Sequence, residues 1–242
     1  MAPSVMVPVL SLLDRRDQVD RGACAAYAQR ACETWLDGFL VAGSLGLGFR
    51  LPERVQWDLL EVWRSHVPAD RLFACAWRPS ETLRISDAGV RPVLVLRDLK
   101  DDDAVLRALE SLPTDALVYS HPQYTGAVLS SAVVDKARSI GSLPAGAKVS
   151  KVELEDVRAL REAAGPEFAL FDGRCRHVCA SVAAGATGVV AVPLTVLPED
   201  LPPRENVHAL QAVIDRGQAV VDAHSDVADQ ADALRRLLLE SL

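Results

Sequence analysis

The amino-acid sequence predicts an α/β protein with the fold of a (β/α)8 (TIM) barrel and a shortened C-terminal helical extension. Short apolar segments alternate with helical patterns along most of the chain, eight such segments can be counted, and a length of 242 residues suits one barrel. Half of the residues are hydrophobic but only 5% are aromatic, so we expect a core built mainly from Ala, Val and Leu.

The predicted strands are short and continuously apolar, as strands buried on both faces of a parallel sheet should be. They are expected at Val5–Leu13, Gly38–Gly43, Leu72–Trp77, Pro92–Leu96, Ala116–Tyr119, Ala145–Lys148, Phe168–Phe171 and Gly188–Val192.

Helical patterns separate these strands. They are expected at Val19–Trp35, Pro52–Ser65, Asp101–Ser111, Ser130–Ile140, Leu154–Ala164 and Arg174–Ala184. The connection from Arg78 to Arg91 has a weaker pattern, with room for only one or two helical turns. The Asp residues of "RDLKDDD" favour the N-terminus of a helix over a metal site.

Two further helices follow the last strand. The segment "VLPEDLPP" breaks the chain before helices at about Glu205–Ala223 and Ser225–Ser241, the second of them amphipathic. We therefore expect residues 1–200 to form the barrel and residues 201–242 to pack on it as part of a single structural unit.

Charge and cysteine content limit the partners and the compartment. A net charge of −7 argues against nucleic acid or an anionic membrane as the main partner. The apolar runs are shorter than the roughly 18 residues of a membrane span, and the start of the chain lacks the basic segment of a signal peptide. With an odd number of cysteines, five, the protein is expected in the reducing cytoplasm.

Two strand ends carry groups suited to amine chemistry. The fifth predicted strand ends at Tyr119 and the sixth at Lys148, and in a barrel the carboxyl ends of the strands form the active face. An amine removed from water loses its proton more readily and can then attack a carbonyl carbon, while a neighbouring phenol can shuttle protons as the imine forms. Taken singly, each residue also has a purely structural interpretation. Lys148 could be a strand-end lysine whose amine reaches water, and Tyr119 could be a core ring whose hydroxyl contacts water.

Two other segments leave alternatives open. The turn "GSLGLG" after the second strand could offer backbone N–H groups to a carboxylate or phosphate, or could simply be a tight strand-to-helix turn. His121, two residues after Tyr119, could line a pocket or be an ordinary turn residue. The "CRHVC" segment lacks a second ligand cluster, so we expect no metal site.

Four segments, in order, resemble the dihydrodipicolinate synthase/N-acetylneuraminate lyase family. They are "GFLVAGSLGLGFRLPERVQ", "YSHPQYTG", "GAKVS" twenty-nine residues after the tyrosine, and "FALFDGRCRHVCASVAAGATGVVAV". They are similar to that family's G-x-x-x-x-G-[ST]-[TG]-G-E, Y-x-x-P-x-x-T-G, G-[apolar]-K and F-x-x-x-[ST]-G patterns, and they run from about Gly38 to Val192.

The resemblance implies a class I lyase or aldolase that binds pyruvate or another 2-oxo acid as a Schiff base, without a cofactor. It implies that Lys148 is the Schiff-base lysine, that Tyr119 is the proton shuttle, and that Ser44 holds the keto-acid carboxylate. We expect substrate-binding positions at Gly43, Leu45, His121, Tyr124 and Gly173. The partners would be a small 2-oxo acid, with an aldehyde as an optional second substrate, and further copies of the chain in a dimer or tetramer.

The sequence also departs from the family pattern. Leu45 stands where the family often has Thr, and Tyr124 stands where the synthases have an arginine for the distal carboxylate of the substrate. The fourth strand is followed by "VLRDLKDD" where many members have Pro-Tyr-Tyr. The resemblance therefore favours an aldolase other than a true dihydrodipicolinate synthase. An imine-dependent dehydratase or condensing enzyme, and an inactive barrel used for binding or assembly, are the alternatives.

Overall fold

The structure is a computed structural model that describes residues 2–123 and 128–242. Eight parallel strands form a closed barrel in the order β1 to β8, as the sequence predicts. The strands are β1 Ser4–Pro8, β2 Gly38–Val41, β3 Leu72–Ala76, β4 Arg91–Val95, β5 Leu117–Ser120, β6 Gly146–Val149, β7 Ala169–Asp172 and β8 Gly188–Val190.

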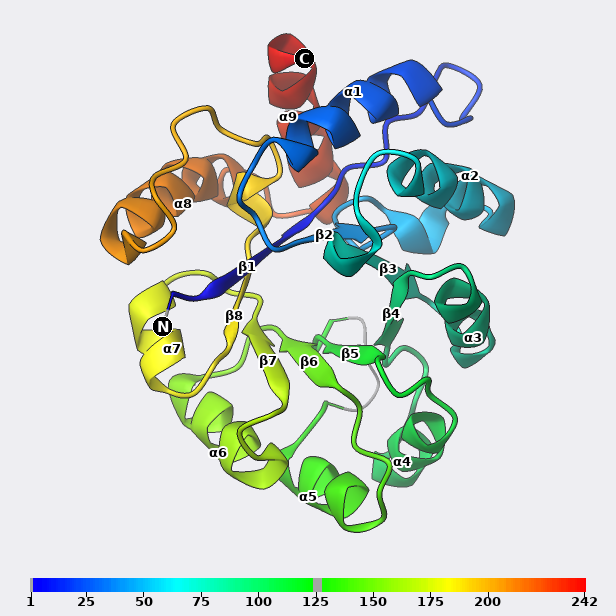
Figure 1. Ribbon diagram of the computed structural model, residues 1–242, viewed down its shortest axis with the longest axis vertical. Helices are drawn as coiled ribbons and strands as arrows, with labels where there is room; N and C mark the ends of the chain where they lie inside the picture. The colour runs from blue at the N-terminus through cyan, green and yellow to red at the C-terminus, as the bar shows by residue number, and fades with distance from the viewer. Residues whose placement is uncertain (1, 124–127) are drawn as a thin grey trace. The chain divides into compact units, whose positions relative to one another are not determined.

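Helices alternate with the strands along the described chain (Figure 1). The α-helices are α1 Arg21–Cys32, α2 Glu53–Arg64, α3 Pro79–Asp87, α4 Asp102–Glu110, α5 Ser131–Ser139, α6 Leu154–Ala164, α7 Val178–Ala183, α8 Val207–Asp222 and α9 Val227–Ser241. Three short 3-10 helices were not expected: η1 Gly48–Arg50, η2 Ala69–Arg71 and η3 Val192–Leu194. None of the helices in the described part of the chain is long and apolar enough to cross a membrane.

The chain divides into two compact units. One contains Met1–Ala74 and Ala191–Leu242, and the other contains Cys75–Val190. The predicted division into residues 1–200 and 201–242 stays an expectation.

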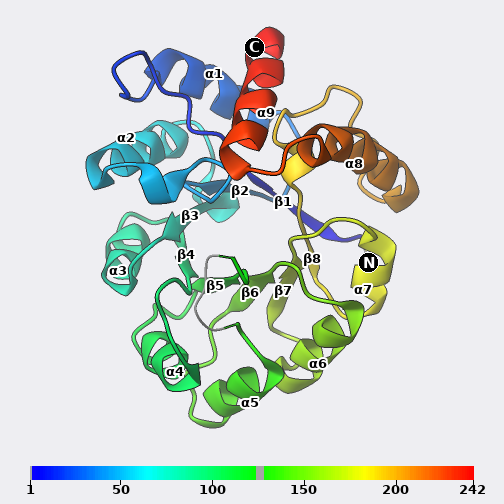
Figure 2. The same ribbon diagram turned by 180° about the vertical axis from the view of Figure 1, so that it is seen from behind.

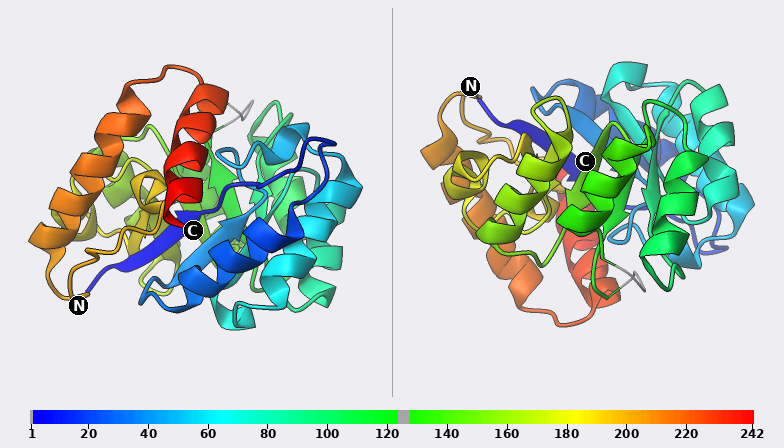
Figure 3. Two further views of the ribbon diagram at one scale, coloured as in Figure 1. Left: turned by 90° about the horizontal axis from the view of Figure 1, so that it is seen from above. Right: turned by 90° about the horizontal axis from the view of Figure 1, so that it is seen from below.

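In the first unit, the C-terminal helices pack with each other and with the start of the chain. Helix α9 packs beside α8 (Figures 2 and 3). The Arg30 guanidinium of α1 donates to the carbonyls of Ser241 and Leu197, both at 2.7 Å. Buried Trp63 and Tyr27 meet edge to face, with ring centroids 5.1 Å apart. These rings are exceptions in a core made mostly of Val, Leu and Ala.

In the second unit, helices α4, α5 and α6 lie outside strands β5, β6 and β7 (Figure 1). Each of the first two helices begins with a side-chain cap. Asp101 accepts a hydrogen bond from the amide of Ala104 at 2.8 Å, and Ser130 accepts one from the amide of Val133 at 3.2 Å. The acidic segment before α4 is therefore a helix start, as predicted.

Three predicted elements differ from the structure. The first strand ends at Pro8 rather than Leu13. The residues from Val9 to Leu12 are buried but are not part of the strand, and Leu13 forms an isolated antiparallel bridge with Val19. The apolar run therefore correctly indicated that this segment is buried, but it did not indicate where the strand ends. The weak connection holds a nine-residue helix, α3, because Pro79 occupies its first turn and the Glu81 carboxylate accepts from the amides of Trp77 and Arg78.

The third difference concerns the helix expected at Arg174–Ala184. Helix α7 begins only at Val178. The chain first makes a turn in which the Asp172 carboxylate accepts from the Arg174 amide at 2.7 Å and Cys175 adopts a left-handed conformation with φ of 56°. A helix cannot pass through that conformation.

Candidate active site

Tyr119 and Lys148 are direct partners in the sheet. The register pairs Tyr119 of β5 with Lys148 of β6, and Lys148 in turn with Phe171 of β7. Residues paired in this way on neighbouring parallel strands place their side chains on the same face. The sequence expectation that these two strand ends lie together is met by the geometry.

The two side chains are in contact as well as paired. Lys148 Nζ lies over the Tyr119 ring, 4.0 Å from its centroid, and the exposed fractions of the two residues are 5% and 2%. The ring face attracts an ammonium group, whereas removal from water disfavours any charge. The amine is therefore held at one place beside a phenol and away from bulk water.

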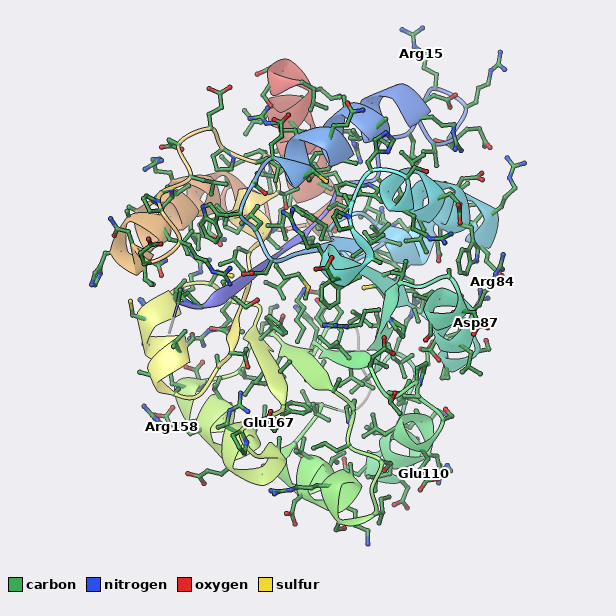
Figure 4. All side chains as sticks on the ribbon, in the orientation of Figure 1. Arg15, Arg84, Asp87, Glu110, Arg158 and Glu167 are labelled. Carbon is green, nitrogen blue, oxygen red and sulfur yellow. The ribbon has the colours of Figure 1, made fainter. Side chains whose placement is uncertain are left out.

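Among the described residues of this unit, the buried Asp, Glu, Lys and Arg side chains are Glu81, Lys148 and Asp172. The labelled charged side chains Arg84, Asp87, Glu110 and Arg158 project from the outer helices (Figure 4), and all four are exposed. Lys148 is the one of the three buried residues that carries an amine, and the other two are carboxylates that accept hydrogen bonds.

Two buried thiols interact electrostatically with Lys148. Burial raises the pKa of Cys75 to about 12, and the Lys148 charge opposes this shift only partly. Burial and the neighbouring Asp172 carboxylate raise the pKa of Cys175, whose Sγ lies 3.1 Å from the Val190 carbonyl oxygen. Both thiols stay protonated at neutral pH, so the nucleophile that this environment favours is the amine.

His121 is the third polar group beside the pair. Its ring meets the Tyr119 ring edge to face, with centroids 6.1 Å apart and planes at 75°. Its Nδ1 accepts from the Gln123 amide at 3.0 Å. Burial lowers the pKa of His121 to about 4, with further lowering by the charges of Lys148 and Lys151. The imidazole is therefore neutral at pH 7. Its predicted part in substrate binding stays a prediction.

The lowered pKa of His121 predicts a pH dependence of stability. Its ordinary value is 6.5, so between pH 6.5 and 4 the unfolded chain binds a proton that the folded protein does not. The free energy of unfolding should therefore fall by about 2 kcal/mol from this residue as the pH drops from 7 to 5. Urea unfolding of His121→Phe at both pH values should show a smaller fall. The same substitution at exposed His208 is the control, and an equal fall in all three proteins would contradict the assignment.

Gly173 lies against the lysine side chain. A methyl group at this position would come within 2.3 Å of Ser150 Oγ and 3.0 Å of Lys148 Cε. Gly173 therefore leaves the room that the lysine chain occupies. This contact is consistent with its predicted place in the site.

The Gly173→Ala variant should disturb the amine without unfolding the protein. The two nearest atoms belong to side chains that can rotate, so Ser150 Oγ and the end of Lys148 should move. We expect reductive trapping of pyruvate to slow by about tenfold or more, because a small misplacement of a reacting group has large kinetic effects. Gly22→Ala is a matched control, since a methyl group there meets only Asp20 Oδ1 at 3.6 Å. Unchanged trapping in Gly173→Ala would show that the lysine position is not critical.

The glycine-rich turn after β2 belongs to the first unit. Gly43 and Leu45 are buried and Ser44 is half-buried. The Leu47 amide donates to the Ser44 carbonyl at 3.0 Å, and Ala42 and Leu47 both have left-handed backbone conformations with φ of 54°. The turn is tight, which agrees with its interpretation as a strand-to-helix turn. Its role in binding a carboxylate stays a prediction.

The remaining predicted site residue, Tyr124, lies outside the described residues. Arg97 follows β4 and Arg174 follows β7, and either could bind a carboxylate if it were free. Arg97 is exposed and 3.6 Å from the Asp98 carboxylate, and Arg174 contacts the Glu153 carboxylate at 2.9 Å. Each is thus already paired with an acidic group.

Sequence reasoning missed Cys75, Ser150 and Asp172. Ser150 follows Lys148 by two residues, so strand periodicity could have placed it on the same face. Asp172 is different: it pairs with Val149, and its carboxylate accepts from Ser181 of α7, so it belongs to the helix-facing side. Within residues 2–123 and 128–242, no group of three or more His, Cys, Asp or Glu could hold a metal ion.

Comparison with known proteins places this geometry in context. No protein-family model matches the chain. Among curated proteins, it is 26% identical over 205 residues to the 4-hydroxy-tetrahydrodipicolinate synthase of Synechococcus sp. (strain CC9605), a match that covers 78% of this chain and 67% of the synthase.

Several solved structures share the fold. A dihydrodipicolinate synthase family protein from Coccidioides immitis has a TM-score of 0.80 and 16% identity over 99% of this chain and 84% of that one. The 2-keto-3-deoxygluconate aldolase from Picrophilus torridus has a TM-score of 0.80 and 18% identity over 98% and 93%. YagE from E. coli K12, a prophage protein of the same family in complex with pyruvate, has a TM-score of 0.71 and 20% identity over 98% and 80%.

The fold and the buried lysine–tyrosine pair define a (β/α)8 barrel protein with an amine held beside a phenol. The chain is similar in sequence to the curated synthase and shares its fold with a dihydrodipicolinate synthase family protein and with a 2-keto-3-deoxygluconate aldolase.

Proposed function

We propose that this protein is a Schiff-base-forming lyase or aldolase that acts on pyruvate or another 2-oxo acid through Lys148. The observation that carries the proposal is the buried Lys148 amine, 4.0 Å from the centre of the Tyr119 ring. Two of the structurally similar proteins support a 2-oxo acid as the substrate. YagE was solved in complex with pyruvate, and the Picrophilus torridus protein is a 2-keto-3-deoxygluconate aldolase.

The proposed chemistry begins with attack of the neutral Lys148 amine on the ketone carbon. The new C–N bond converts the ketone to a carbinolamine, and loss of water gives the imine. Tyr119 is the proposed proton shuttle, taking a proton from the attacking nitrogen and returning it to the departing hydroxyl. The imine then accepts the electron pair when the neighbouring C–C bond breaks, or supplies the enamine when that bond forms.

The carboxylate of the 2-oxo acid is proposed to bind at Ser44 and the adjoining backbone of Gly43 and Leu45, as the family resemblance implies. We also propose that the protein works in the cytoplasm as a homodimer or homotetramer and needs no cofactor. The five cysteines, all of them free, suit a reducing compartment.

The direct test is reduction with borohydride in the presence of pyruvate, read by intact-protein mass. We expect a stable adduct, and peptide mapping should place it on Lys148. Wild-type protein that forms no adduct with pyruvate or with longer 2-oxo acids would overturn the proposal and favour an inactive binding barrel.

Specificity is expected to differ from that of a true dihydrodipicolinate synthase. Tyr124 stands where the synthases have an arginine, and Arg97 and Arg174, two other groups that could bind a carboxylate, are paired with Asp98 and Glu153. The second substrate should therefore be neutral, or carry less carboxylate than aspartate semialdehyde. A coupled assay with pyruvate and aspartate semialdehyde should show turnover well below about 1 s⁻¹, and a faster rate would contradict this expectation.

A further inference from the structure

Three side chains form a contiguous series in the second unit. Lys148 Nζ lies over the Tyr119 ring at 4.0 Å, and the edge-to-face contact with His121 joins that same ring at a centroid distance of 6.1 Å. The ring that carries the proposed proton shuttle is thus contacted by the lysine and by the histidine. His121 comes directly after the end of β5, and the ring contact shows that its side chain lies beside that of Tyr119.

The histidine is itself fixed by the turn that follows β5. Its Nδ1 accepts a hydrogen bond from the Gln123 amide at 3.0 Å, and its exposed fraction is 9%. Only a neutral imidazole can accept at Nδ1, and its proton is then on Nε2. The short turn therefore sets both the ring orientation and the tautomer.

Charge explains why this form is kept. Protonation would place an imidazolium among groups that include the amines of Lys148 and Lys151, and both of these oppose it. Burial acts in the same direction and is the larger cause of the lowered pKa. The imidazole therefore remains an uncharged packing surface at neutral pH.

We infer that His121 is a positioning residue for the proposed imine chemistry: its neutral ring, anchored by the Gln123 amide, holds the Tyr119 ring against Lys148. The inference rests on the proposed function and goes beyond it, because it assigns to His121 a role that acts through the phenol. The ring of His121 matters for this role, and its ability to titrate does not.

Two variants separate the ring from the turn. His121→Phe keeps an aromatic ring beside Tyr119 but loses the acceptor for the Gln123 amide. His121→Asn loses the ring, while its side-chain oxygen can still accept from an amide two residues ahead. We expect the rate of pyruvate trapping to fall by about tenfold or more in His121→Asn and by a clearly smaller factor in His121→Phe. Wild-type rates in His121→Asn, or equal losses in both variants, would overturn the inference.

A second measurement does not depend on turnover. NMR titration should give His121 a pKa well below 6.5 in the wild type and a higher pKa in Lys148→Met, because one of the opposing charges is removed. An identical pKa in both proteins would overturn the inference, since the side chains would then not form one coupled group. If wild-type protein gives no adduct, the proposed function fails, and the titration alone decides whether His121 is coupled to the lysine.

Discussion

Lys148→Arg is expected to abolish formation of the pyruvate adduct completely. Arginine keeps a positive charge over the Tyr119 ring, but its guanidinium stays protonated and delocalised and cannot become the neutral amine that attacks a ketone. The measurement is intact-protein mass after borohydride reduction, compared with wild type at the same pyruvate concentration. The melting temperature should change little if the lysine serves chemistry more than packing.

Lys136→Arg is the matched control for this variant. Lys136 lies exposed on α5, so the same substitution there should leave trapping and stability unchanged. Full activity of Lys148→Arg on the protein's own substrate would show that the lysine has a structural role. The assignment of Lys148 as the Schiff-base lysine, which rests on the family resemblance, would then be wrong.

Tyr119→Phe should slow imine formation by about 10²–10⁴-fold, the usual effect of losing a general acid–base group. The substitution removes only the hydroxyl and keeps the ring face on which Lys148 Nζ lies. Adduct should therefore still form on Lys148, but slowly. The measurement is the time course of reductive trapping at saturating pyruvate.

Tyr27→Phe provides the contrasting case. Tyr27 is fully buried, and its hydroxyl donates to the Thr195 carbonyl at 2.6 Å in the first unit. Losing that bond should lower the free energy of unfolding by about 1 kcal/mol and leave trapping unchanged. If Tyr119→Phe behaved in the same way, with normal trapping and reduced stability, the phenol would be a core residue and not a proton shuttle.

Much of the fold follows from the sequence. Eight apolar segments separated by helical patterns predicted the closed barrel, and Asp101 and Ser130 stand at helix starts where their side chains cap the first turn. The two strand ends at Tyr119 and Lys148 could also be read directly from the chain. These features are local, because they depend on which residues are neighbours in sequence.

The composition of the site was decided by the tertiary structure. Strands buried on both faces are apolar throughout, so their sequence does not show which side chains point inward or how one strand is shifted against the next. The register that pairs Tyr119 with Lys148 exists only in the assembled sheet. So do the contact of His121 with the phenol ring and the space that Gly173 leaves for the lysine chain. The sequence by itself determined the fold and the two strand-end residues Tyr119 and Lys148, whereas their mutual contact and their surroundings depend on packing between segments distant in the chain.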